Sequence, residues 1–218
     1  MRVTNRSGSR ERLITAARDE LVACGGHLEM KAVAKRAGVS VGLAYHHFGS
    51  KAGLLAATVD AFYDALDAVA LGVEFVDGSW AARERERIRR YVSFHFEEPF
   101  AELMLGRLVT EPEVITVWQA RLEQLIEQGT RNIARAQRRG EIPATTRPDV
   151  TVAMLLGGIH QAISTALASS GRPSPEELAD ALWTLVVSAV GAKPDAGTVV
   201  PSDERSDDRG KGVRQAHG

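Results

Sequence analysis

The chain has 218 residues, of which 44% are hydrophobic and 25% are charged, a composition that is ordinary for a globular protein and excludes a disordered or fibrous chain. Its 27 basic and 28 acidic side chains nearly cancel, which excludes a uniformly basic protein that wraps nucleic acid. The single cysteine, Cys24, excludes an internal disulfide framework and a cysteine-based zinc site.

The charges are unevenly distributed along the chain. Residues 1–52 carry nine basic and four acidic side chains, and by subtraction the rest of the chain carries 18 basic and 24 acidic ones. This asymmetry indicates one part that meets a polyanion and another part that does not. The polar, basic start lacks the apolar segment of a secretory signal, and no unbroken run of about 18 apolar residues occurs. We therefore expect a cytoplasmic protein without membrane contact.

Helical spacing dominates the first third of the sequence. Leu, Ala, Arg and Glu recur at intervals of three and four, whereas alternating β-branched residues are nearly absent, so we expect an all-α fold. The predicted helices cover about residues 10–24, 29–36, 40–48 and 50–72. Gly25 and Gly26 end the first helix, and Ser40 caps the third.

The same spacing continues through the remainder of the chain. We expect a helix over about 80–98, ended by Pro99, and a brief helix near 100–108. Capping boxes at Thr110 and Ser174 predict the start of a long helix to about residue 139 and of a last helix to Gly191. A further helix is expected to begin at Thr146. Residues 192–218 are rich in Gly, Ser, Asp, Arg and Pro, which predicts a disordered tail.

The stretch VAKRAGVSVGLAYHHF, residues 33–48, carries a helix-turn-helix pattern. Two short helices that cross steeply need a small residue in the first helix and a residue that tolerates positive φ in the turn. Ala34 and Gly38 stand four apart in these roles. Apolar residues surround them, while Lys35, Arg36, Val41 and His46 are expected to point outward. Such spacing also occurs in helical hairpins that serve packing alone, so this alternative stays open at this point.

The continuation to Leu55 resembles the signature of the TetR family of bacterial transcriptional regulators, approximately AGVSxGxLYxHFxSKxxLL, over about residues 10–62. This resemblance implies an all-helical homodimer with an N-terminal DNA-binding domain and a larger C-terminal domain that binds a small effector. We then expect a flexible basic arm over 1–9 and a DNA-binding domain over 10–52, with its motif at about 30–49. An effector-binding and dimerisation domain over 53–191 and the tail over 192–218 complete the chain.

The resemblance also implies which residues contact DNA. Ser40 would cap the second helix of the motif and donate to a phosphate, Val41 and Leu43 would face the bases, and Gly42 would allow close backbone approach. The full predicted set is Lys35, Ser40, Val41, Gly42, Leu43, Tyr45, His46 and Lys51. One departure matters, because Glu29 stands where the family usually has a threonine that donates to a phosphate.

In the C-terminal part, the resemblance implies dimerisation through the last two helices. The predicted interface comprises Leu155, Gly158, Ile159, Ile163, Leu178, Leu182, Leu185 and Val186. The alternative is that these residues pack inside one subunit. A second set with aromatic and polar members predicts an effector pocket: Tyr91, Phe94, His95, Phe100, Met104, Trp118, Leu122 and His160. For these residues the alternative is ordinary core packing, and for His95 it is a satisfied buried histidine.

The leading hypothesis is a dimeric repressor that a small, largely apolar effector releases from a palindromic operator on double-stranded DNA. An enzyme would need a nucleophile with its base, paired carboxylates or a metal cluster, and the sequence shows none, so we expect no catalytic residue, metal or cofactor. The remaining alternative is a helical protein-interaction module without effector binding. Steeply salt-dependent binding to duplex DNA distinguishes the regulator from both.

Overall fold

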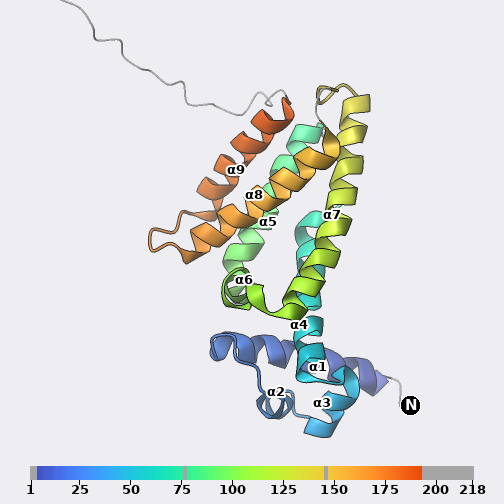
Figure 1. The fold of residues 1–218 in the computed structure, drawn as a ribbon, viewed down its shortest axis with the longest axis vertical. Helices are drawn as coiled ribbons and strands as arrows, with labels where there is room; N and C mark the ends of the chain where they lie inside the picture. The colour runs from blue at the N-terminus through green and yellow to red at the C-terminus, as the bar shows by residue number, and fades with distance from the viewer. Residues whose placement is uncertain (1–3, 76–77, 145–146, 193–218) are drawn as a thin grey trace, which may run out of the picture.

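The computed structural model describes residues 4–75, 78–144 and 147–192 (Figure 1). All elements in these ranges are helical, and no strand occurs among them, so the predicted all-α fold class is confirmed. The first helices form a head, and the later helices form a longer body. Figure 1 shows the head below the body. Residues 193–218, which include nearly all of the predicted tail, lie outside the described ranges.

The head consists of α1 (Thr4–Ala23), α2 (Met30–Arg36) and α3 (Val41–Phe48). α1 begins at Thr4, six residues before the predicted start, so part of the expected flexible arm is helical. Leu13, Ala17 and Leu21 of α1 are fully buried. They form the inner stripe that the periodicity predicts, and α2 and α4 pack against α1.

Helix α4 (Lys51–Leu66) links the head to the body and continues as a π-helical turn, η1 (Asp67–Leu71) (Figure 1). Ser50 caps α4, because its hydroxyl oxygen accepts a hydrogen bond from the Gly53 backbone N–H at 2.9 Å. Seven residues of α4 are buried, including Leu54, Phe62 and Tyr63. One continuous helix therefore contributes side chains to both parts of the molecule.

The body contains α5 (Trp80–Glu97), α6 (Pro99–Leu105), the 3-10 turn η2 (Arg107–Thr110), α7 (Pro112–Arg138), α8 (Pro148–Ala168) and α9 (Pro175–Val190). α5 packs on α9, α7 packs on α8, and α4 packs on α7. The approach of α7 to α8 requires Gly129, because a Cβ there would lie 2.7 Å from Cγ1 of Val152. These pairings enclose the core of the body.

Of three predicted helix starts in the body, one is confirmed, one is wrong and one rests on a residue outside the described ranges. The capping box at Ser174 is present, with reciprocal hydrogen bonds between Ser174 and Glu177. The one predicted at Thr110 is wrong, because Thr110 belongs to η2 and α7 begins after Glu111, whose side chain forms no capping hydrogen bond. Thr146 lies outside the described residues, and α8 begins after Arg147.

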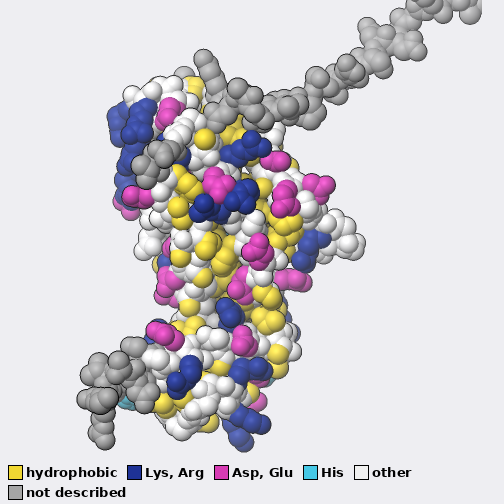
Figure 2. Space-filling model, turned by 180° about the vertical axis from the view of Figure 1, so that it is seen from behind, with side chains coloured by type: hydrophobic (Ala, Val, Ile, Leu, Met, Phe, Trp, Pro, Cys, Tyr) yellow, Lys and Arg dark blue, Asp and Glu magenta, His cyan; other side chains and the backbone are white. Residues whose placement is uncertain are grey.

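A basic surface lies at the end of the body opposite to the head. The last turns of α7 carry Arg131, Arg135 and Arg138, and Arg139 follows as the C-cap residue; all four are exposed. Figure 2 shows Lys and Arg side chains gathered at this end, while charges of both signs are mixed over the rest of the visible face. Basic side chains here stabilise the C-terminal end of a helix dipole. The acidic net balance of the body thus conceals a local concentration of positive charge.

Candidate DNA interface and effector site

The turn between α2 and α3 has the geometry that the motif requires. Gly38 has φ of +66°, a conformation that side chains with Cβ rarely adopt. Ala34 and Ala44 are fully buried, so the two helices meet at small residues. The backbone N–H of Val39 donates to the carbonyl of Ala34 at 3.0 Å and closes the turn. Residues 30–48 therefore form a helix-turn-helix unit, and the predicted roles of Ala34 and Gly38 are confirmed.

We define the recognition face as the exposed residues Ser40, Gly42, Tyr45, His46 and Lys51, at and around α3. The Ser40 hydroxyl oxygen accepts from the Leu43 backbone N–H at 3.2 Å, so its own hydrogen is left for a phosphate oxygen. A Cβ at Gly42 would meet nothing within 4 Å, which leaves this backbone open to close approach. The recognition face therefore combines hydrogen-bond donors with accessible backbone.

The other predicted contact residues lie differently. Lys35 is exposed on α2, whereas Val41 and Leu43 are half-buried, and Val41 packs against the core of the head. The two apolar residues thus offer less surface to a base than the resemblance implied. Arg36 also points outward, but it forms an ion pair with Glu20 at 3.0 Å that ties α2 to α1.

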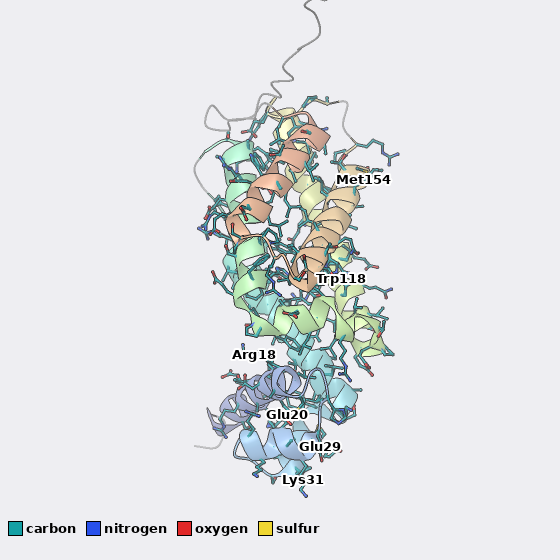
Figure 3. All side chains as sticks on the ribbon, turned by 90° about the vertical axis from the view of Figure 1, so that its left-hand side faces the viewer. Arg18, Glu20, Glu29, Lys31, Trp118 and Met154 are labelled. Carbon is teal, nitrogen blue, oxygen red and sulfur yellow. The ribbon has the colours of Figure 1, made fainter. Side chains whose placement is uncertain are left out.

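Glu29 occupies the N-cap position of α2 and its side chain is exposed. Its carboxylate makes no capping hydrogen bond and no ion pair with any described residue. Figure 3 shows Glu29 and Lys31 together at the α2 side of the head. A free carboxylate at this place would repel a DNA phosphate, as the departure from the family signature indicated.

One contact between α1 and α3, which the sequence analysis did not predict, positions the helix that carries most of the recognition face. Ser9 of α1 is 4% exposed, and its hydroxyl lies 2.8 Å from Nε2 of His47 on α3. One residue further along each helix, the Arg10 guanidinium lies 5.5 Å from the centre of the Phe48 ring. A signal for this contact existed, since Ser9 stands four residues before the buried Leu13 and falls on the inner stripe of α1.

The head and the body meet where α1 packs on α6. Arg18 of α1 forms an ion pair with Glu98 at 3.5 Å, and Figure 3 shows Arg18 on the body side of the head. The side chain of Arg107, in η2, covers Gly26, where a Cβ would lie 3.0 Å from its Cδ. The Gly25–Gly26 turn, with φ of +57° and +90°, thus makes room for a contact between the two parts.

Most of the predicted effector residues meet in one aromatic cluster, which we define as Phe62, Tyr63, Tyr91, Phe94, His95, Phe100, Trp118 and His160. Phe62 of α4 lies at its centre, with ring centroids 5.3 Å from Phe94, 5.9 Å from His95 and 5.8 Å from Phe100. Phe62 and Tyr63 were missing from the predicted set, although both follow the apolar stripe of α4. The rings contact one another, so a ligand would have to part them.

The second half of the aromatic cluster is a stack across three helices. Trp118 of α7 stacks on Tyr63 of α4 at 5.7 Å and on His160 of α8 at 4.7 Å. Figure 3 shows Trp118 among the helices of the body, where its side chain is half-buried. Of the other two predicted pocket residues, Met104 is buried on α6 and Leu122 is half-buried on α7. Neither of these two residues has an aromatic ring, so neither belongs to the aromatic cluster.

His95 is 3% exposed, and its Nδ1 lies 2.8 Å from the carbonyl oxygen of Tyr91. Burial lowers the pKa of His95 to about 4, so this imidazole is neutral at neutral pH. Burial also lowers the pKa of His160 and raises the pKa of the Tyr63 and Tyr91 hydroxyls. Among the described residues, no group of three or more His, Cys, Asp or Glu could hold a metal ion.

The predicted dimer residues divide into two groups. Ile163, Leu182 and Val186 are at most 4% exposed within one subunit, so for these three the alternative of internal packing is right. Leu155, Ile159 and Leu178 are half-buried, whereas Gly158 and Leu185 are exposed. By length and mean hydropathy alone α8 would suffice to cross a membrane, and only 28% of its most apolar window is buried. The sequence analysis considered only unbroken apolar runs, so it did not predict that α8 is apolar enough by this measure.

The comparisons with known proteins agree with this geometry. Residues 13–58 match the family model described as bacterial regulatory proteins, tetR family. Salmonella enterica GusR superposes with a TM-score of 0.68 at 18% identity, over 84% of this chain and 96% of that chain. A TetR-like transcriptional regulator from Rhodococcus sp. RHA1 gives 0.65 at 18% identity, over 85% and 97%.

A third similar structure is AibR in complex with isovaleryl coenzyme A and operator DNA, with a TM-score of 0.62 at 18% identity, over 85% of this chain and 100% of that chain. At these identities the solved structures show a shared fold. No curated protein matches the chain.

The exposed second helix of a helix-turn-helix unit, carried on an all-helical body, defines a DNA-binding transcriptional regulator. The likeness to the tetR family of bacterial regulatory proteins covers residues 13–58, which contain this unit.

Proposed function

We propose that the chain acts as a homodimer that represses transcription from a palindromic operator and that a small, largely apolar effector releases it. The observation that carries this proposal is an exposed stripe on α8, from Val150 through Met154 and Gly158 to Thr165. Met154 is 65% exposed, and Leu185 of α9 is 64% exposed. Large apolar side chains at such exposure indicate a surface that another protein covers.

The two glycines of α8 point to the same surface. A Cβ at Gly157 or Gly158 would meet nothing within 4 Å in the subunit, in contrast to Gly129, whose neighbour Val152 fills the space. Glycine inside a helix lowers its stability, so a requirement from outside the subunit accounts for both residues. Gly158 also borders an open groove with Gln161, Ala162, Thr165, Ala166, Ser169 and Pro173. A second copy of α8 fits this surface, since small residues allow close helix approach.

A two-fold dimer presents two recognition faces related by symmetry, and this favours a palindromic operator. The half-sites would be about one helical turn apart, roughly 34 Å, or a multiple of that distance. Within each half-site we assign phosphate contacts to Lys35, Ser40 and Lys51, and groove contacts to Tyr45 and His46. A dimer bound across a promoter excludes polymerase by occupancy alone, which favours repression over activation.

The aromatic cluster supports an effector-responsive protein. It includes side chains from α4, the helix that leads from the head into the body, so a ligand that parts these rings would move α4 relative to α7 and α8. The two heads of a dimer could adopt a spacing that fits the operator or another spacing that does not. A ligand that binds the second arrangement more tightly weakens DNA binding by the ratio of its affinities for the two arrangements. AibR, whose structure contains both isovaleryl coenzyme A and operator DNA, supports a ligand-binding role for this fold.

The test is selection of bound duplexes from a random library at moderate salt, with the molecular mass measured on the same preparation. We expect an inverted repeat bound by a dimer. Replacing Tyr45 or Lys51 with Ala should weaken binding to all duplexes, whereas changing Leu43 should alter sequence preference. A folded protein that binds no duplex even at low salt would contradict the regulator and favour the interaction module. Because half-buried Leu43 offers limited surface, the change in preference is expected to be modest.

A further inference from the structure

Arg121 of α7 binds three carboxylates on the helix that leads from the head into the body. Its guanidinium lies 2.5 Å from the carboxylate of Asp60, 2.5 Å from that of Asp64 and 3.1 Å from that of Asp67. Nε, Nη1 and Nη2 all donate in these contacts. Asp60 and Asp64 belong to α4, and Asp67 begins η1, so the acids follow one face over about two helical turns. We define these four residues as the Arg121 cluster.

The three aspartates are unfavourable for α4 by itself. Like charges four residues apart repel each other on a helix surface, and Asp67, near the C-terminal end, faces the negative end of the helix dipole. The stability of α4 therefore does not explain the acidic stripe, which a guanidinium from α7 offsets. Positions at which a chain departs from local preferences are expected to serve function. The Arg121 cluster accordingly indicates a requirement for a fixed placement of α4 on α7.

The Arg121 cluster differs from an ordinary surface ion pair. Isolated exposed pairs contribute little, because both side chains must be ordered and water screens them. Here the Arg121 side chain is only 19% exposed, and its planar, rigid donor group holds three acceptors at different heights along α4. Three residues earlier on α7, Trp118 stacks on Tyr63 of α4 at 5.7 Å. A shift of α4 along α7, or a rotation about its own axis, would break at least one of these contacts.

α4 carries the head on the body. Leu54 and Leu55, near its start, are buried, and α4 packs on both α1 and α3 of the head. The Arg121 cluster holds the other half of the same helix. A second polar link between head and body is the ion pair of Arg18 with Glu98, in which the Arg18 side chain is 44% exposed and therefore less constrained. The angle at which α4 lies on α7 thus sets where the head stands relative to the body.

We propose that Arg121 is a positioning residue for operator binding. By holding the three aspartates it fixes the angle between head and body, and in the dimer this angle sets the distance between the two recognition faces. The inference rests on the proposed function, since it specifies how the dimer selects its half-site spacing. The hydrogen-bond partners of Arg121 lie on α4 and η1, so it acts on the recognition face through α4.

Distances between the two heads test the proposal without DNA. Cys24, the single cysteine, is exposed at the end of α1, so a nitroxide on its thiol reports the position of the head. Pulsed electron–electron double resonance on the labelled full-chain dimer should give one narrow distance distribution. We expect Arg121→Met to broaden it, because α4 then lacks its rigid partner on α7. Arg131→Met is the matched control, since Arg131 pairs with Glu127 within α7, and should keep the narrow distribution.

The spacing of the half-sites provides the second measurement. One base pair inserted at the centre of the selected operator separates the half-sites by about 3.4 Å more and rotates them by roughly 35°. We expect the wild type and Arg131→Met to bind this duplex about tenfold more weakly or worse, because both heads no longer fit at once. Arg121→Met should lose most of this difference. A loss of folded protein lowers binding to both duplexes equally, so the ratio of affinities reports positioning and not stability.

A second variant keeps the test valid if Arg121→Met unfolds because three carboxylates are left unbalanced. Combining Arg121→Met with Asp60→Asn, Asp64→Asn and Asp67→Asn removes these charges, so the fold should be kept and the broad distribution should remain. A narrow distribution with full spacing preference in this variant, or equal changes in Arg131→Met, would overturn the proposal. A selected operator with unchanged spacing preference removes this inference alone. A folded monomer, or a dimer that selects no operator, contradicts the proposed function instead.

Discussion

The hydroxyl of Ser9, near the start of α1, lies 2.8 Å from Nε2 of His47, near the end of α3. The two residues are 38 positions apart, and Ser9 is 4% exposed. Together with the Arg10 guanidinium over the Phe48 ring, this contact holds α3 against α1. Ser9 is therefore a positioning residue for DNA binding, although it does not belong to the recognition face.

Replacing Ser9 with Ala tests this role. Loss of the hydrogen bond to His47 is worth about 0.5–1.5 kcal/mol, so we expect roughly a three- to tenfold loss of operator affinity and a small loss of stability. Fluorescence anisotropy with the selected duplex and a thermal melt would measure both. Thr15→Ala, on the exposed side of the same helix, is the control and should change neither. Unchanged affinity in Ser9→Ala would show that α3 is held by other contacts.

Glu29→Thr should strengthen DNA binding. The exposed carboxylate at the start of α2 repels phosphate and forms no capping hydrogen bond, whereas threonine removes that repulsion and is a favoured capping residue. We expect an increase of several-fold in affinity at low salt that shrinks as salt is added, because screening weakens the repulsion in the wild type. Glu11→Thr, an exposed residue of α1, serves for comparison. If the gain does not depend on salt, its cause is not electrostatic.

The glycines of α7 and α8 should respond in opposite ways to larger side chains. Gly158→Leu should leave the subunit folded, because nothing within 4 Å opposes its Cβ, but it should separate the dimer. Gly129→Ala should destabilise the subunit by about 1–3 kcal/mol through its clash with Val152. Sedimentation velocity and chemical denaturation measure the two effects. A Gly158→Leu variant that stays dimeric would place the interface elsewhere.

His95 makes stability depend on pH. Its pKa is lowered to about 4 from 6.5, so the unfolded chain binds a proton more tightly than the folded one. The stabilisation is present above pH 6.5 and is lost as the pH falls toward 4, by about 3 kcal/mol in total at 1.4 kcal/mol per pKa unit. Urea denaturation at successive pH values should show this loss in the wild type and in His27→Phe, the control at an exposed position of the head. His95→Phe should show a flatter profile, and an unchanged slope would mean that other groups cause it.

Short-range patterns could be predicted because their causes lie within a few residues. The turn at Gly38, the cap at Ser40 and the capping box at Ser174 each depend on φ preference or on a side chain that reaches the backbone three residues on. The capping box predicted at Thr110 is wrong, although its sequence pattern is the same as that at Ser174. There the chain forms η2 instead, so tertiary context overrode the local signal.

The sequence by itself determined an all-α protein with a helix-turn-helix unit, since helical periodicity, capping and turn chemistry are local properties of the chain. Only the tertiary structure decided that Ser9 supports α3, that Phe62 and Tyr63 join the aromatic cluster, and that Ile163 faces inward while Met154 faces out. The physical reason is that α8 is apolar on more than one face. Which face is buried within the subunit depends on how α7 and α9 pack against it, and no local pattern encodes that packing.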